Sequence, residues 1–300
     1  MELKDITTLE DTDHENFGRN YDFVGRVTPA SHEAIEAFPT YIEGAIERFF
    51  KVAGFADNEK VVGQWAERFG LPDDLAVEML DQATLIGEAP EGDNAGQAKK
   101  DLIDSLGKWA RVRLLQRLHR DFCLGVLAML RNHAVAAMGY LRVQCETAAI
   151  VKMTADSPDV GADWWHAITI GEGRAFYRRH NKMVAKTLKR AGLYTYYDIG
   201  SSMAMHSRGA GIVHGILYGG ETEETDDTAT IKVTFQDLDS PADIFRYFAS
   251  YILAHKSIAK LVEAGLPELT AEQHADLSAR FHARVGSVVR AAVQRFPLEQ

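Results

Sequence analysis

The residues best suited to chemistry lie together in one predicted helix, residues 196–215, which reads YYDIGSSMAMHSRGAGIVHG. This segment sets Ser202, His206, Arg208 and His214 among apolar side chains. Ser202 and His206 are four residues apart and therefore share a helix face. An imidazole transfers protons near neutral pH, and a guanidinium stabilises carboxylate or phosphate charge. Because polar groups in apolar surroundings cost free energy without partners, we expect either a reactive site or a closed polar network.

A second pair of candidate residues, Arg142 and Glu146, lies in the apolar segment AVAAMGYLRVQCETAAIVKM. Their spacing of four residues places both side chains on one face of a helix. A charged pair in such a segment is either a satisfied buried ion pair or the wall of a site. We expect this helix to face the one at residues 196–215, so that Arg142 and Glu146 meet Ser202 and His206.

Positive charge concentrates in two segments. Residues 99–120 hold seven bases and two acids, and residues 174–190 hold seven bases and no acid. Two cationic helices could line a groove for RNA or another polyanion. The alternatives are a solvated helix face and a contact with the acidic N-terminal part. The predicted substrate contacts in the second segment are Arg174, Arg178, Arg179 and Lys182.

Metal and cofactor signatures are missing from the sequence. It contains no HExxH, no Glu-x-x-His pair, no phosphate-binding glycine loop of the Walker or dinucleotide type, and no GxSxG elbow. We therefore expect neither a metal nor a cofactor. A metal-dependent hydrolase built on His206, His214 and Glu146 is kept as a second alternative.

The run from Arg208 to His214, followed by Gly215, resembles the Arg-x(4–6)-His motif of the HEPN superfamily of helical domains. Many HEPN motifs carry Asn after the Arg, where this chain has Gly209. Only this pair combines a trailing Gly with an apolar helix. Three other pairs have the same spacing: Arg26 with His32, Arg113 with His119, and Arg174 with His180.

A wider pattern covers about residues 100–260. Arg142 and Glu146, followed by a helix with Tyr197, Ser202 and His206, are also similar to a group of uncharacterised bacterial helical proteins of unknown function. That resemblance leaves the N-terminal part of the chain unexplained.

The HEPN resemblance implies a homodimer with a composite cleft and metal-independent RNA cleavage, of the toxin or phage-defence type. His214 would move a proton, Arg208 would stabilise phosphate charge, and Glu146 and Arg142 would orient the site. Residues 174–190 would hold the RNA backbone. The alternative is a non-catalytic helical protein that binds a partner or small ligand, in which the polar side chains form a structural network.

Helical periodicity dominates the chain, so the predicted fold is all-α. We expect a helical bundle with a small N-terminal helical segment and at most one short strand element, at residues 228–235. Residues 1–30 are predicted as an extended lead-in, and residues 31–97 as an acidic N-terminal helical segment and linker. Residues 98–300 are predicted to form the HEPN-like bundle.

Local signals place several helix ends. A break in the long proline-free helical stretch is expected near Arg120 or at Arg131 and Asn132, and a turn at residues 156–161. The remaining predicted ends rest on capping residues: Gly192, Ser240, and a capping box of Thr270 with Gln273.

The formal net charge of −10 is unevenly distributed. Residues 1–96 hold 21 acids and 7 bases, whereas residues 97–300 hold 22 acids and 26 bases. The acidic part is therefore a candidate surface for a protein partner, and the remainder is compatible with RNA. The sequence has no apolar run long enough for a bilayer and no signal-peptide start, so we expect a cytoplasmic protein without membrane contact. Cys123 and Cys145 are predicted to be buried free thiols.

Overall fold

The computed structural model describes residues 3–53, 95–169, 171–201, 220–225, 228–233 and 240–296. These residues are almost entirely helical, which confirms the all-α prediction, and their strands form a single antiparallel hairpin of β1 (Gly220–Thr225) and β2 (Thr228–Val233). The helices are α1 (Leu3–Val27), α2 (Ala30–Val52), α5 (Ala95–Leu130), α6 (Ala134–Asp156), α7 (Pro158–Thr169), α8 (Gly173–Arg190), α9 (Tyr194–Gly200), α11 (Pro241–Ala264) and α12 (Ala271–Arg295).

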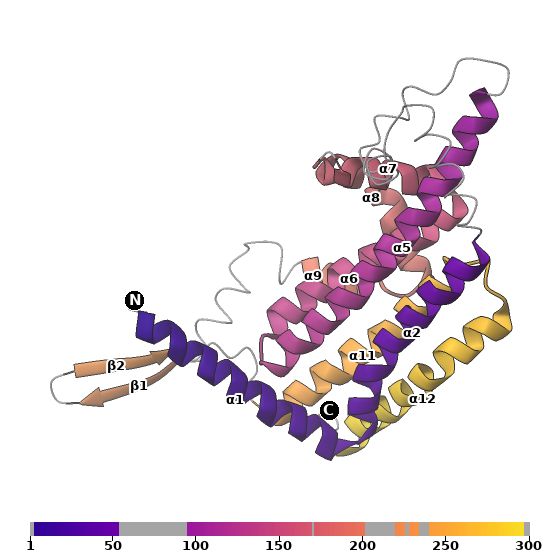
Figure 1. Cartoon of the computed structure of the whole chain (residues 1–300). Helices are drawn as coiled ribbons and strands as arrows, with labels where there is room; N and C mark the ends of the chain where they lie inside the picture. The colour runs from indigo at the N-terminus through magenta and orange to yellow at the C-terminus, as the bar shows by residue number, and fades with distance from the viewer. Residues whose placement is uncertain are drawn as a thin grey trace.

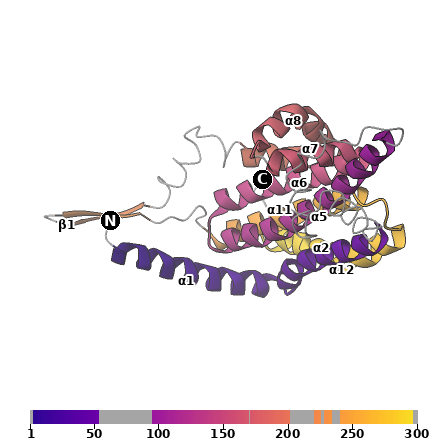
Figure 2. The same ribbon diagram turned by 45° about the horizontal axis from the view of Figure 1, so that its top comes forward.

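The long helices α5 and α6 form the central pair of the bundle (Figure 1). On one side α2, α11 and α12 pack together, and on the other lie α7, α8 and α9 (Figures 1 and 2). Helix α1 crosses the end of the bundle where α5 turns into α6, and the Asn20 side chain donates a hydrogen bond to the Leu130 carbonyl there. The candidate residues that the structure describes lie on α6, α8 and α9.

The break in the long helical stretch lies at Arg131 and Asn132, the second of the two predicted positions. Asn132 adopts a φ of 66°, and the His133 amide donates to the Ala128 carbonyl at 2.8 Å. A single left-handed residue is a common way to end an α-helix, and Asn tolerates that conformation better than most residues. Arg120 lies inside α5, so the alternative break is wrong.

The predicted capping residues are confirmed. The Ser240 hydroxyl accepts the Asp243 amide at 3.1 Å and begins α11. Thr270 and Gln273 form both hydrogen bonds of the capping box at the start of α12. Gly192 follows α8 with a φ of +70°, where a side chain would be strained. These ends were predictable because their signals lie within a few residues.

Two predictions of local structure are wrong. The lead-in is not extended, because α1 covers Leu3–Val27 and buries Asn20, Val24 and Val27 along one face. Polar residues interrupt the apolar residues along α1, so the sequence shows no clear helical periodicity there. The predicted turn at residues 156–161 is also replaced, because only Ser157 separates α6 from α7, and Pro158 occupies the favoured first position of α7.

The centre of the core contains a fully buried histidine, His255, beside Phe38 and Phe122 with ring centroids at 4.8 Å from each. Its Nδ1 lies 2.7 Å from the Tyr251 carbonyl oxygen, and its Nε2 lies 2.6 Å from Oε1 of Gln144. The Gln144 amide also reaches the Tyr251 hydroxyl at 2.8 Å. A buried polar network of this kind fixes the register of α6 against α11.

The two cysteines lie on different helices and are both free thiols. Cys145 on α6 is buried, as predicted, whereas Cys123 on α5 is exposed, which corrects the prediction for that residue. No described helix is long and apolar enough to cross a membrane.

Candidate functional site

Arg208 and His214, which carry the HEPN resemblance, lie outside the described residues, as do Ser202 and His206. The structure describes the elements that lead to them. Helix α9 ends at Gly200, immediately before this segment, and packs against α6 and α8. The expectation that α6 faces this part of the chain is therefore confirmed for α9.

Arg142 and Glu146 form the predicted ion pair. Nη2 of Arg142 lies 2.9 Å from Oε1 of Glu146, and the two side chains are 18% and 9% exposed. Tyr197 of α9 completes the group: its hydroxyl hydrogen-bonds to the Glu146 carboxylate, and its ring lies under the Arg142 guanidinium at 5.4 Å. These contacts tie α9 to α6, while Nε of Arg142 is buried without a hydrogen-bond partner among the described residues.

Burial raises the pKa of Glu146, while Arg142, Arg117 and the Tyr197 hydrogen bond oppose that rise. On the other side of this cluster, Arg117 hydrogen-bonds to Tyr177 of α8, whose pKa is raised to about 12 by burial and by Glu146. Four helices thus meet around one carboxylate. Sequence reasoning missed Arg117 and Tyr177, because no local spacing connects α5 with α8.

The exposed face of α8 carries an uninterrupted row of positive charge. Its cations recur every fourth residue, all are exposed, and none forms an ion pair within the described part of the chain. Four residues of an α-helix rise about 6 Å, so the four intervals between these five cations span about 24 Å along the helix axis. The opposite face buries Phe176, Val184 and Leu188. We call this row the α8 ridge: Arg174, Arg178, Lys182, Lys186 and Arg190.

Arg179 does not belong to the ridge. Its guanidinium binds both carboxylate oxygens of Asp163 on α7, at 3.1 and 2.5 Å, and Nε2 of His180 lies 2.7 Å from the same carboxylate. Burial acts to raise the pKa of Asp163, but the hydrogen bonds from Arg179 and His180 outweigh it and the pKa is lowered. This predicted substrate contact is therefore already engaged in holding α7 against α8.

In the basic segment on α5, three of the seven cations are engaged in ion pairs. Arg111 is buried and makes a bidentate pair with Glu268, at 2.6 and 2.9 Å. Arg117 and Arg120 both pair with Asp121, at 3.4 and 2.8 Å. Lys100, Lys108 and Arg113 form no ion pair with another described residue, so the α5 segment keeps part of its charge, whereas every cation of the α8 ridge is unpaired among the described residues.

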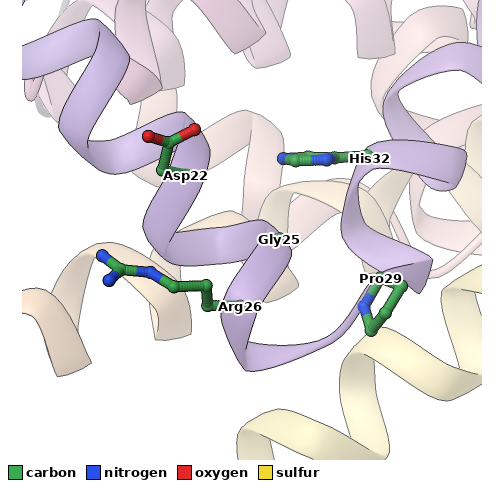
Figure 3. Close-up of a pocket in the computed structure, with 5 residues that line it drawn as sticks. All are labelled: Asp22, Gly25, Arg26, Pro29 and His32. Carbon is green, nitrogen blue, oxygen red and sulfur yellow. The ribbon is translucent and has the colours of Figure 1, made fainter.

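The three other Arg–His pairs show where a separation of six residues places the two side chains. On one continuous helix six residues place two side chains about 120° apart. Accordingly, His119 of α5 pairs with Glu43, not with Arg113, and His180 pairs with Asp163. Arg26 and His32 differ because the chain reverses between them, and both line one cavity at the corner of α1 and α2 (Figure 3).

Cys123 lies one turn after His119 on α5, near Glu43. Although Cys123 is exposed as a residue, partial desolvation of its thiol, together with the negative charge of Glu43, raises the pKa of that thiol. A nucleophilic cysteine needs the opposite shift. This grouping therefore does not form an activated nucleophile.

Among the described residues, no group of three or more His, Cys, Asp and Glu side chains is placed to hold a metal ion. His206 and His214, two of the three ligands of the metal-dependent alternative, lie outside that part of the chain. The third, Glu146, is held by Arg142 and Tyr197.

Comparison with known proteins finds no matching family model, no matching curated protein and no matching solved structure.

Proposed function

We propose that this protein binds RNA through the α8 ridge and cleaves it without a metal, using Arg208 and His214. The observation that carries the proposal is the ridge itself. Five exposed cations at regular spacing, on a helix without a single carboxylate, provide a strip of positive charge for a phosphate backbone. Neutralising phosphates releases condensed counterions, which favours binding.

The position of α9 supports the assignment of cleavage to the segment that follows it. Helix α9 follows α8 after one short turn and packs against it, so that segment begins beside the ridge-bearing helix. In the proposed reaction His214 takes the proton of a ribose 2′-hydroxyl as its oxygen attacks the adjacent phosphorus, and Arg208 stabilises the charge on that phosphate. The P–O5′ bond breaks, which leaves a 2′,3′-cyclic phosphate, and the departing 5′-oxygen takes a proton from water. The requirement for a 2′-hydroxyl makes RNA, rather than DNA, the substrate.

In this account Arg142 and Glu146 are positioning residues. They hold Tyr197, and Tyr197 holds the end of α9 from which the reactive segment continues. The engagement of the Glu146 carboxylate by Arg142 and Tyr197 also favours the second candidate function, a non-catalytic RNA-binding protein. The two functions differ in one property only, because the second predicts binding without cleavage.

The test compares two triple variants. Arg178→Gln/Lys182→Gln/Lys186→Gln removes the middle of the ridge. The control, with the same change in charge, neutralises exposed cations on α5 and α11 that lie off the ridge: Arg113, Lys256 and Lys260.

Fluorescence anisotropy with a labelled RNA oligonucleotide at low salt should show that the ridge variant binds at least about tenfold more weakly than the wild type, while the control binds nearly normally. His214→Ala should bind normally and fail to cleave. Equal loss in both triple variants contradicts binding at the ridge. Undiminished cleavage by His214→Ala contradicts the assigned chemistry, and binding without cleavage by the wild type supports the second function.

A further inference from the structure

The corner between α1 and α2 contains a cavity of about 420 Å3. Two residues, Thr28 and Pro29, separate the helices, so the last turn of α1 faces the first turn of α2. Figure 3 shows Asp22 and Arg26 leaving successive turns of α1, with His32 projecting from α2 toward that helix. The residues that line the cavity are Asp22, Gly25, Arg26, Pro29 and His32.

The His32 ring is held in one orientation. It stacks on the Tyr21 ring, with centroids 3.9 Å apart and planes 9° apart, and its Nε2 lies 2.8 Å from the Tyr21 carbonyl oxygen. A carbonyl only accepts, so Nε2 carries a hydrogen, and Nδ1 is the acceptor when the ring is neutral. Gly25 makes this placement possible, because a Cβ there would lie 2.3 Å from the ring.

The charged groups at the cavity are not neutralised by one another. Asp22 and Arg26 are exposed, and neither forms an ion pair with another described residue. The Arg26 guanidinium extends away from His32 in Figure 3, so a ligand that bridges both requires this exposed side chain to change rotamer. The cavity thus offers one mobile cation, one carboxylate and one fixed imidazole acceptor.

We propose that this corner binds a small zwitterion, a molecule in which an ammonium group lies a few ångströms from a carboxylate or phosphate. The ammonium group donates to the Asp22 carboxylate and to Nδ1 of His32, and the oxyanion pairs with Arg26. Two acceptors beside one cation match both charges of such a ligand, whereas a simple anion would meet the repulsion of Asp22. This site is independent of RNA binding.

The test follows the ring resonances of His32 by NMR in the full chain, assigned with His32→Gln. O-phosphoethanolamine and β-alanine serve as zwitterion probes, and inorganic phosphate and ethanolamine carry one charged group each. We expect saturable shifts with at least one zwitterion at concentrations up to about 10 mM, and much smaller shifts with the single-charge compounds. The two zwitterions distinguish a phosphate from a carboxylate ligand.

Arg26→Gln should weaken zwitterion binding at least about tenfold, because it removes a charged hydrogen bond. The matched control is Arg19→Gln, on the same helix and outside the cavity, which should bind normally. No saturable shift in the wild type overturns the proposal, as does equal binding of zwitterion and phosphate. Equal weakening by Arg26→Gln and Arg19→Gln also overturns it.

Discussion

Acid should destabilise this protein through His255. The ring is fully buried, and burial lowers its pKa to about 3 from the ordinary value of 6.5, with the hydrogen bond to the Tyr251 carbonyl opposing the shift. A neutral ring donates from one nitrogen only. Since Nδ1 donates to the Tyr251 carbonyl, Nε2 of a neutral His255 must accept a hydrogen bond. The Gln144 amide must then be turned so that its NH2 group, and not Oε1, faces Nε2. Both orientations of the amide have the same shape, so either one fits the structure.

The sign and size of the effect follow from proton linkage. Below pH 6.5 the unfolded histidine takes up a proton that the folded histidine with a pKa of about 3 does not. The unfolded state therefore gains stability as the pH falls. Between pH 7 and pH 5 this lowers the free energy of unfolding by about 2 kcal/mol, and the loss approaches about 5 kcal/mol below pH 3.

Urea unfolding measured from pH 7 to pH 5 tests this reasoning, with His255→Gln as the reference that lacks the titrating group. The wild type should lose about 2 kcal/mol more than the variant over that range. If the variant does not fold, the protonation state of His255 in the wild type is read from its ring nitrogen shifts by NMR. Equal losses, or an imidazolium at pH 5 to 7, would refute the neutral assignment, because a charged ring could donate to both oxygen atoms.

Three substitutions test the packing of the bundle. Glu146→Gln should lower the free energy of unfolding by about 2–4 kcal/mol in chemical denaturation, because it leaves the largely buried Arg142 without its counter-charge. Gly125→Ala should cost about 1–3 kcal/mol, since its Cβ would lie 1.9 Å from the Tyr251 hydroxyl; a neutral effect would show that α11 shifts freely. Thr270→Ala should cost about 1 kcal/mol through loss of the capping box, and Thr270→Ser should restore most of it.

The parts of the fold that could be predicted depend on short-range signals. The Ser240 cap, the Thr270 box and the Gly192 stop each involve residues close together in sequence. The pairing of Arg142 with Glu146 was predictable for the same reason, because the two side chains are one helical turn apart. The concentration of bases at residues 174–190, without an acid, was also visible in the sequence.

The predictions that failed depend on distant partners. Arg111 pairs with Glu268, 157 residues away, and nothing near Arg111 in sequence indicates that its charge is neutralised. Arg179 is neutralised by its pairing with Asp163 of α7. The first residues of α7 were predicted to form a turn, so this partner was not expected. Charge composition therefore located the basic helices correctly but could not show which of their cations form ion pairs.

The salt dependence of RNA affinity tests the central claim most directly. For single-stranded RNA the slope of log K against log salt falls by about 0.7 for each cation that no longer contacts a phosphate. Removing Arg178, Lys182 and Lys186 should therefore make the slope shallower by about 2, with little change in the control variant of α5 and α11. A slope that is the same in both variants and the wild type would contradict the assignment of the α8 ridge as the RNA-binding surface.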